Sequence, residues 1–347
     1  MSFLADVSRS VSATPPNLDE ELVAKTVSEQ FGLHGDLTEL ISERDQNFRL
    51  TSADGTAFVV KVTSLAEDPV VTDFQIAALI HLENRGLNGV PRILRSLSGQ
   101  DRGAIQTADG SGICLRVVTW LDGQLLSDID VTPEIAQRLG RRLAELDLAL
   151  EDFSHPGENQ LLLWDSQRAG DLRGLLGHVN DPLVRESVES VLDDFDSNVK
   201  PALDSLPQQV IHNDANDENI LLDAHGDVSG IIDFGDMLKA PRVVDVSTAA
   251  SYLRTSGDPL RLIEPFVAAY RRHNALLEAE IEVLFDLIRT RLSMSLIVLF
   301  WRLAARDEAD LYRQKTLAAN RNALAFLQNL SSLGRGAFLQ RLMKKNN

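Results

Sequence analysis

The sequence is poor in cysteine: Cys114 is the single one among 347 residues. An intrachain disulfide needs two cysteines and is therefore excluded, and this composition favours a reducing, cytoplasmic setting. Cys114 stands between Ile113 and Leu115, a pattern that indicates a buried strand thiol and not a nucleophile. The length allows two domains with a large core.

Long apolar runs and basic residues are also scarce. The longest apolar run, 296–301, has six residues, whereas a membrane helix needs about 20. The N-terminus lacks a basic start followed by an apolar core, so we expect no signal peptide. With 34 Lys and Arg against 51 Asp and Glu, the net charge is −17, which argues against nucleic acid or an anionic membrane as a partner.

Glycine-rich phosphate loops are missing, since neither G-x-G-x-x-G nor G-x-x-x-x-G-K-[ST] occurs in the chain. A P-loop NTPase is therefore disfavoured. Any phosphate cover must instead use backbone N–H groups and polar side chains, and we predict the turn at 42–47, with Gln46 and Asn47, for this purpose.

The most informative stretch is 209–245. Its apolar runs at 210–211, 220–222 and 228–232 are bounded by turn residues and predict short buried strands. Eight acidic residues but only two basic ones lie between His212 and Asp245. Such a density of negative charge is costly unless cations bind there.

Three spaced elements of this stretch resemble the sequence motifs of a known superfamily. The pattern His212-x-Asp214-x-x-x-x-Asn219, followed fourteen positions later by Asp233 of an Asp-Phe-Gly triplet, resembles the catalytic and metal loops of the protein-kinase-like superfamily. The resemblance implies Asp214 as catalytic base, Asn219 and Asp233 as Mg²⁺ ligands, and His212 as a support for the loop. The alternative is a polar loop whose side chains cap turns.

The first half of the chain predicts an antiparallel meander with helices. We expect a loose arm at 1–17, a helix at 18–31, a helix at 69–84, and strands at 37–41, 47–52, 57–63, 89–97, 105–107 and 112–120. Lys61 alternates with apolar neighbours and by itself indicates a solvent-facing side chain. In its context it resembles the strand lysine that grips the nucleotide phosphates in kinases.

Two further nucleotide-site predictions follow from that resemblance. Asp73, in the first turn of the helix at 69–84, is the candidate acidic partner of Lys61, although it also suits the helix dipole. The stretch 118–123 matches the hinge between kinase lobes, where the backbone at Val118, Trp120 and Leu121 would bind the purine edge. Trp120 as an ordinary core aromatic is an equally good interpretation.

The second half predicts a helical region. We expect helical segments at 132–150, 163–175, 187–203, 243–253, 258–275, 278–305 and 307–332. We assign the apolar stripes at 132–150 and 187–203 to core faces. Asp245 resembles the acidic residue that braces the catalytic loop in small-molecule kinases.

Taken together, residues 20–330 resemble the aminoglycoside phosphotransferase/choline kinase-like family. The sequence at 43–48, 212–221 and 230–237 is most similar to its hydroxylysine kinase branch. The family implies an α+β, bilobal protein-kinase-like fold, with an antiparallel sheet plus helix in an N-lobe at 18–119 and a mainly helical C-lobe at 120–347. It also implies ATP or GTP as co-substrate and Mg²⁺, two ions by analogy.

The branch implies transfer of the γ-phosphoryl group to a small hydroxylated amine, with 5-hydroxylysine as the best candidate. Asp217, Asp236 and Glu218 would meet its ammonium group, and Arg242 or Arg302 its carboxylate, although a surface salt bridge explains Arg302 better. Homoserine, choline, ethanolamine and aminoglycosides remain alternative acceptors. A catalytically silent, nucleotide-binding pseudokinase is the alternative from another class.

Overall fold

The computed structural model describes residues 15–42, 44–106, 112–304 and 311–344. Most of the predicted arm (1–14), Glu43, the end of the predicted strand at 107 and the start of the predicted helix at 307–310 lie outside these ranges. The chain divides into two compact units. The N-terminal unit extends to Gly123 and includes the returning segments His155–Leu161 and Ser229–Ile232, while the remaining residues form the C-terminal unit.

The N-terminal unit contains a five-stranded antiparallel sheet in the order β1-β2-β3-β5-β4. The strands are β1 (Asp36–Leu40), β2 (Gln46–Thr51), β3 (Ala57–Val62), β4 (Gly103–Gln106) and β5 (Gly112–Thr119). Buried positions alternate along β2 and at the end of β3, which places Phe48, Val60 and Val62 on one buried face. The predicted antiparallel meander is therefore confirmed.

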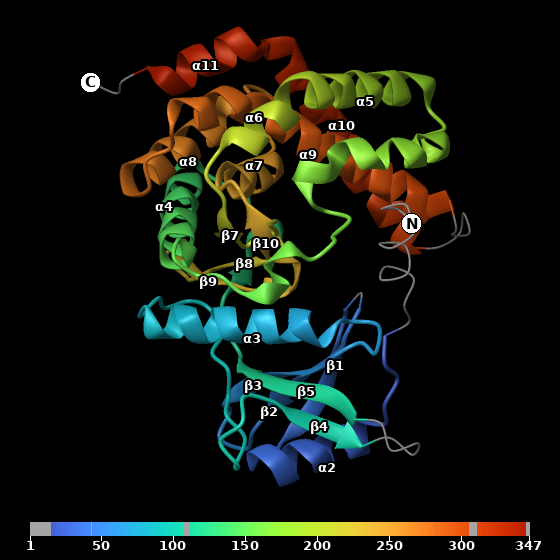
Figure 1. The fold of residues 1–347 in the computed structure, drawn as a ribbon, viewed down its shortest axis with the longest axis vertical. Helices are drawn as coiled ribbons and strands as arrows, with labels where there is room; N and C mark the ends of the chain where they lie inside the picture. The colour runs from blue at the N-terminus through green and yellow to red at the C-terminus, as the bar shows by residue number, and fades with distance from the viewer. Residues whose placement is uncertain (1–14, 43, 107–111, 305–310, 345–347) are drawn as a thin grey trace. The chain divides into compact units, whose positions relative to one another are not determined.

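Helix α2 (Glu20–Phe31) covers that apolar face (Figure 1). The Asp19 side chain caps its start by accepting from the Glu21 N–H, and Gly32 ends it in the left-handed region at φ 69°. Helix α3 (Pro69–Asn84) has the bounds that the sequence predicts and reaches the other face, where Gln75 accepts a 2.5 Å bond from Arg116 of β5.

The predicted strand at 89–97 is wrong. In this segment an isolated bridge joins Ile93 to Val118, with Arg92 O accepting from Thr119 N–H. Two residues account for the difference: Pro91 has no N–H to donate to a ladder, and Gly89 has a φ of 64°.

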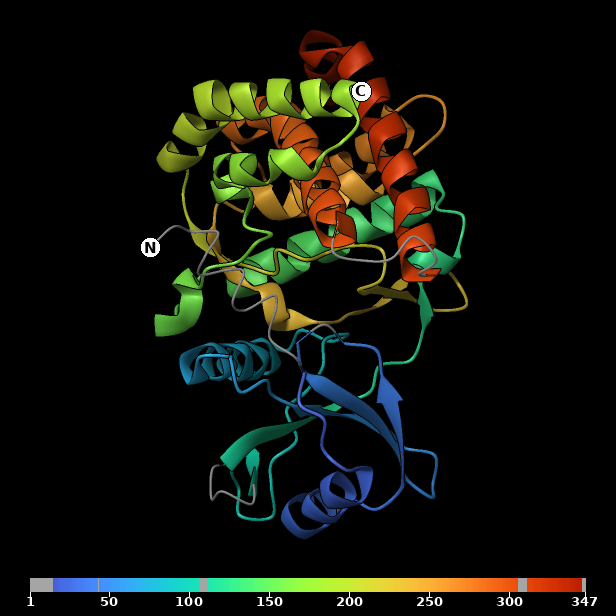
Figure 2. The same ribbon diagram turned by 90° about the vertical axis from the view of Figure 1, so that its right-hand side faces the viewer.

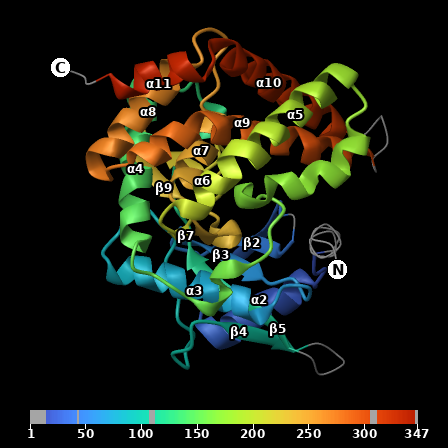
Figure 3. The ribbon, with the colours of Figure 1, turned by 45° about the horizontal axis from the view of Figure 1, so that its top comes forward.

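The C-terminal unit is mainly helical, as predicted. Its helices are α4 (Pro133–Leu150), α5 (Pro182–Asp194), α6 (Lys200–Ser205), α7 (Val243–Tyr252), α8 (Leu260–His273), α9 (Glu278–Ala304), α10 (Leu311–Leu333) and α11 (Arg335–Met343). Figure 2 shows α9 running through the interior of this unit, and seventeen of its residues from Ile281 to Leu303 are among those buried. Helices α4 and α8 lie side by side (Figures 1 and 3), and they approach closely because Gly140 has no Cβ to meet the Phe266 carbonyl.

The predicted helix at 187–203 differs in detail from the observed one. Helix α5 starts five residues earlier, capped by Asp181, and a single π turn at Phe195–Val199 separates it from α6. A further segment of 3-10 helix, η3 (Ser166–His178), replaces the helical stretch predicted at 163–175.

Short strands frame the polar turns of the acidic stretch. They are β6 (Gln124–Leu125), β7 (Gln209–Ile211), β8 (Ile220–Leu222), β9 (Val228–Ile231) and β10 (Leu238–Ala240). Within the C-terminal unit β7 pairs with β10 and β6 pairs with β8, both antiparallel. The turn after β7 carries His212 and Asp214 and is anchored by these buried strands. Among the described residues no helix has the length and apolar character needed to span a bilayer.

Candidate active site

A buried carboxylate holds the turn after β7. Asp245, on the first turn of α7, accepts from the backbone N–H of His212 at 3.0 Å and of Asn213 at 2.7 Å. Asn213 adopts φ 63°, a left-handed conformation that asparagine tolerates better than most residues. Two charge-assisted bonds therefore fix the backbone just before Asp214.

A second buried carboxyl lies behind Asp245. Asp147, on α4, accepts a 2.5 Å bond from the Tyr270 hydroxyl of α8. Burial raises the pKa of Asp147 well above its usual range, and the nearby charge of Asp245 raises it further. Burial also raises the pKa of Asp245, but its bonds from two backbone N–H groups oppose that shift. Of the two carboxyls, Asp147 therefore keeps a proton more readily, and Asp245 carries the negative charge more readily.

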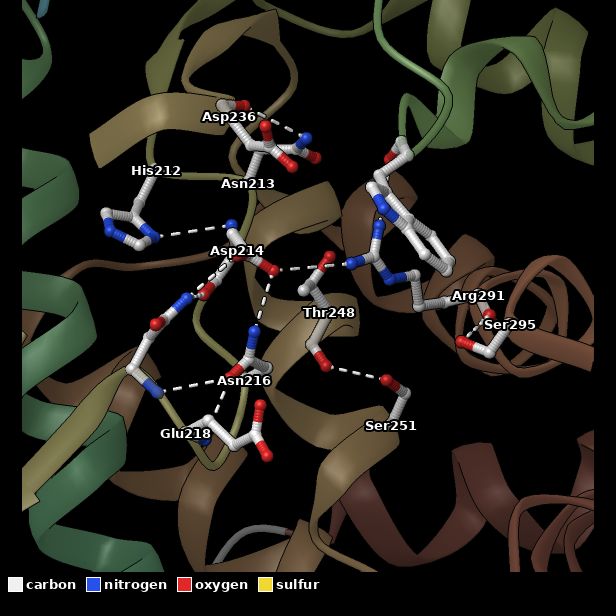
Figure 4. Close-up of polar contacts among 12 residues, drawn as sticks. His212, Asn213, Asp214, Asn216, Glu218, Asp236, Thr248, Ser251, Arg291 and Ser295 are labelled. Carbon is white, nitrogen blue, oxygen red and sulfur yellow. Dashed lines mark hydrogen bonds and ion pairs between the residues drawn. The ribbon is translucent and has the colours of Figure 1, made fainter. Parts of the chain in front are cut away.

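Asp214 is held from three sides (Figure 4). Its Oδ1 accepts from the Asn216 side chain at 2.9 Å, its Oδ2 accepts from the Asn219 side chain at 2.7 Å, and Arg291 Nη2 lies 3.7 Å from Oδ1. The Asp214 side chain remains 19% exposed, so a ligand hydroxyl can reach it. Burial raises the pKa of Asp214 well above its usual range; Asp236 and Asp233 raise it further, and Arg291 opposes them.

His212 lies fully buried beneath this turn. Its Nδ1 accepts from the Asp214 backbone N–H at 3.3 Å, and its ring meets the edge of the Phe234 ring at a centroid distance of 4.7 Å. The imidazole thus ties the turn that carries Asp214 to the Asp-Phe-Gly turn.

Asn219 and Asp233 suit a cation that also binds phosphate. The Asn219 amide nitrogen donates to Asp214, which leaves its amide oxygen for a metal. Asp233 sits in a left-handed turn at φ 60°, where one carboxylate oxygen accepts from the Gly235 N–H at 3.3 Å. Within the described ranges no group of three or more His, Cys, Asp or Glu side chains forms a metal cage. Mg²⁺ in nucleotide sites uses one or two protein carboxylates plus phosphate and water, so the donor set fits it.

In the N-terminal unit, Lys61 and Asn47 share one face of the sheet. Asn47 of β2 and Arg116 of β5 are the direct cross-strand neighbours of Lys61 on β3. This face is opposite to the one that Val60 and Val62 present to the core. The Asn47 Oδ1 is buried without a hydrogen-bond partner. A polar ligand at this face would satisfy it.

Two other predicted nucleotide contacts have different partners in the structure. Asp73 forms an ion pair with Arg102, and its partnership with Lys61 stays a prediction. Gln46 is 5% exposed and is bonded to the Leu18 backbone, accepting at 2.9 Å and donating at 3.2 Å. The Gln46 side chain therefore holds the backbone at Leu18, and we omit Gln46 from the phosphate site.

The predicted purine hinge is an extended end of β5. Val118 is buried, and the Trp120 N–H donates to Ala57 O at 3.2 Å. The Trp120 ring packs under the Arg49 guanidinium, 4.3 Å from the ring centroid. This N–H is therefore already used, and Leu121, which is partly exposed, is the next backbone position along the stretch.

Of the predicted acceptor residues, Asp236 and Asp217 lie close to Asp214, but Arg242 has a different role. Arg242 makes two bonds to the Glu280 carboxylate, at 3.1 and 3.0 Å, and one of 2.6 Å to Asn274. Since Glu280 is only 1% exposed, this is an internal ion pair. We correct the prediction accordingly: the Arg242 guanidinium is engaged inside the unit and is not an acceptor ligand.

Arg291 and Arg254 were not predicted as site residues from the sequence. Arg291 is 1% exposed, in the middle of a mostly apolar stretch of α9, and this unusual position was the available signal. Arg254 follows the end of α7, and nothing in its local sequence distinguishes it from a surface arginine.

The sequence is similar to known proteins over most of its length. Residues 36–281 match the model of a family described as "Phosphotransferase enzyme family". Hydroxylysine kinase of Danio rerio is 28% identical over 341 residues, covering 94% of this chain and 95% of the relative. Hydroxylysine kinase of Mus musculus is 28% identical over 316 residues, covering 84% of each.

Solved structures with a similar fold are kinases of small molecules. An amicoumacin kinase in complex with AMP-PNP, Ca²⁺ and its ligand has a TM-score of 0.68 at 17% identity, covering 91% of this chain and 94% of that one. A microcompartment-associated aminopropanol kinase has a TM-score of 0.63 at 17% identity, covering 93% and 100%. At these identities the likeness shows the fold alone, and it confirms the kinase-like architecture.

Proposed function

The chain belongs to the phosphotransferase enzyme family and is an enzyme that phosphorylates an alcohol group, and we propose that its acceptor is 5-hydroxylysine and its donor GTP or ATP. The observation that carries the proposal is the constellation of Asp214, Asn219 and Asp233 in one rigid turn system. The name of the full-length vertebrate relatives supports hydroxylysine as the acceptor.

In the proposed reaction Asp214 receives the proton of the acceptor hydroxyl as its oxygen attacks the γ-phosphorus. Asn216 and Asn219 hold the carboxylate in one rotamer through bonds of 2.9 and 2.7 Å, so it is oriented before the substrate arrives. Phosphoryl transfer requires little covalent chemistry from the protein, and positioning of this kind supplies much of the rate.

Asn219 and Asp233 would hold Mg²⁺ on the triphosphate. When bound, the metal neutralises phosphate charge and orients the γ-phosphoryl group. The chain's own contribution is a dense set of carboxylates, since Asp233 and Asp236 both raise the pKa of Asp214 by repulsion. A cation relieves that repulsion, which is why this concentration of acidic residues is tolerated.

For the nucleotide, we propose phosphate contacts from Lys61 and Asn47. Lys61 is the next-to-last residue of β3, the middle strand of the sheet, and the unpaired Asn47 Oδ1 lies on the same sheet face. An amide side chain there offers a donor nitrogen to a phosphate oxygen and an acceptor to a bridging water. The backbone at Val118 to Leu121 remains the proposed contact for the purine.

For the acceptor, Asp217 and Asp236 would receive an ammonium group. Burial raises the pKa of Asp217, and an approaching cation would stabilise its charged form. Homoserine, choline, ethanolamine and aminoglycosides remain alternative acceptors for the same catalytic turn. A pseudokinase typically lacks the base or the metal-binding Asp, and both are present in this chain.

The first test is nucleoside-diphosphate release from ATP and from GTP, with Mg²⁺, against 5-hydroxylysine, homoserine, choline, ethanolamine and kanamycin. We expect acceptor-dependent release with hydroxylysine, and the faster nucleotide identifies the donor. If nucleoside diphosphate is released only with one of the other acceptors, that compound and not hydroxylysine is the substrate. Tight nucleotide binding without release against any acceptor would contradict the proposal.

A further inference from the structure

Arginines of the C-terminal unit differ in how their charge is compensated. Arg242, Arg289 and Arg341 each have a carboxylate oxygen within 3.0 Å. The one carboxylate that the structure places near Arg291 is 3.7 Å away, beyond hydrogen-bond distance. Arg254 forms no ion pair with any residue in the described part of the chain. Buried or half-buried cations without a direct carboxylate partner are unusual and often mark a binding site for an anion.

Arg254 is half-buried just beyond the end of α7. Its Nε donates to Ser251 O at 2.8 Å, and its guanidinium lies 5.0 Å from the centre of the Tyr252 ring. These contacts orient the guanidinium but provide no counter-charge. Burial therefore lowers the pKa of Arg254, and only the more distant Tyr252 and Asp217 oppose that shift. The terminal nitrogens have no partner among the described residues and are available to a ligand.

Arg291 supplies a second positive charge in the same region. Its Nη1 donates to Trp164 O at 2.8 Å, and its guanidinium stacks 5.0 Å from the Trp164 ring centre. Its buried Nε has no hydrogen-bond partner. The Arg291 side chain is fixed and inaccessible, so it acts through its charge and not through direct ligand contact.

Tyr252 links these groups in space. Burial raises the pKa of its hydroxyl; Arg291 and Arg254 act against the shift, and Asp214 and Asp217 add to it. All four charged groups therefore lie within electrostatic range of one hydroxyl. The carboxylate of Asp214, the proposed catalytic base, thus shares its surroundings with a second negative charge and with two positive charges.

Asp217 and Arg254 form an unusual couple within this cluster. Each shifts the pKa of the other, yet the described structure contains no direct ion pair between them. A separated positive and negative pair is complementary to a zwitterion, whose ammonium and carboxylate are attached to one carbon atom. An α-amino acid would bring its ammonium to Asp217 and its carboxylate to Arg254.

We propose that Arg254 binds the carboxylate of the acceptor, with Arg291 as a buried supporting charge, so that the enzyme selects hydroxylated α-amino acids over amino alcohols that lack the carboxylate. This inference rests on the proposed function and assigns the acceptor end of that site. Arginine suits the task because its fork of donors matches a carboxylate in two parallel bonds.

The test compares two acceptors that differ only in the carboxylate: 5-hydroxylysine and 1,5-diamino-2-pentanol. In Arg254→Gln we expect kcat/KM for hydroxylysine to fall about 10- to 100-fold, the loss typical of one charged hydrogen-bonded pair. For the diamine we expect a change of less than about threefold, because it has no group for Arg254. Arg254→Lys keeps the charge and should restore part of the hydroxylysine activity.

Arg141→Gln is the matched control, since it removes the same charge from an exposed position on α4 whose carboxylate partner, Glu145, lies one helical turn away. Its two kcat/KM values should stay within about twofold of the wild type. Equal losses for both acceptors in Arg254→Gln, or no loss for hydroxylysine, would overturn the assignment.

Binding of two unreactive probes separates this inference from the proposed function. L-Lysine and cadaverine also differ only in the carboxylate, and calorimetry on the full chain with nucleotide bound measures both. We expect the wild type to prefer L-lysine and Arg254→Gln to lose that preference. If the wild-type enzyme phosphorylates no acceptor but prefers L-lysine, and Arg254→Gln loses that preference, the proposed function is refuted and the carboxylate site is supported. Absence of any preference for L-lysine would refute the site.

Discussion

Two clusters of the C-terminal unit use the same residue types in opposite ways. Behind the catalytic turn, the Tyr270 hydroxyl donates to Asp147 at 2.5 Å, and Arg242 donates to Glu280 at 3.1 and 3.0 Å. Asp245 accepts from the His212 N–H at 3.0 Å. Around Asp214, Arg291 is 3.7 Å from the carboxylate and Arg254 has no carboxylate partner in the described structure. In the first cluster each carboxyl and the Arg242 guanidinium has a direct partner, which stabilises the scaffold. The second leaves charge uncompensated, as a site for charged substrates requires.

The largest effect should come from the open cluster. We expect Asp214→Asn to lower kcat by about 10²- to 10⁴-fold, the usual contribution of a positioned base, while nucleotide affinity stays within about threefold. Thermal stability should change little, because relief of the repulsion from Asp236 and Asp233 offsets the loss of the negative charge near Arg291. Turnover assays measure kcat, and calorimetry measures nucleotide affinity and thermal stability.

Asp223→Asn, at an exposed turn, is the control for loss of one carboxylate and should leave activity unchanged. A parallel loss of nucleotide affinity and turnover in Asp214→Asn would mean that the carboxylate organises the nucleotide and is not specifically the base.

The closed cluster should respond through stability. We expect Arg242→Ala to cost about 3–5 kcal/mol in the free energy of unfolding, because it leaves the 1%-exposed Glu280 without its counter-charge. The ratio of kcat/KM between hydroxylysine and the diamine should not change in the remaining folded enzyme. Denaturant unfolding and the two-acceptor assay test both statements.

Arg341→Ala provides the comparison, since Arg341 also makes bidentate carboxylate contacts but is 31% exposed. Its loss should cost only about 0–1 kcal/mol. Similar costs for the two variants would contradict the view that burial decides the importance of the Arg242–Glu280 pair.

The smallest effect concerns the proton on Asp147. Since burial raises the folded-state pKa of Asp147 above its unfolded value of about 3.9, its contribution to stability is present below about pH 4 and is lost as pH rises through the folded pKa. Asp147→Asn mimics the protonated carboxyl and avoids this loss. Its melting temperature relative to wild type should therefore rise between pH 4 and 8. A constant difference across that range would mean that Asp147 ionises normally.

Much of the fold and of the catalytic turn was predictable because the signals are local. Pro69 and the residues after it define α3, alternating apolar residues define β2 and β3, and the spacing of Asp214, Asn219 and Asp233 depends on one continuous stretch. The strand at 89–97 failed because apolar composition hides the missing N–H of Pro91. Gln46 and Arg242 were misassigned because their partners, Leu18 and Glu280, are 28 and 38 residues away in the sequence.

The sequence by itself was sufficient to propose which residues carry the chemistry of phosphoryl transfer, since a base, an amide and a carboxylate at fixed spacing are the groups that this reaction uses. The tertiary structure decided which arginines are free to meet a substrate. Arg242 and Arg254 look alike in sequence, but α8 and α9 bring Asn274 and Glu280 to the first, and the described structure brings no carboxylate to the second. The availability of a charge depends on its counter-charges, and those come from residues distant in the chain.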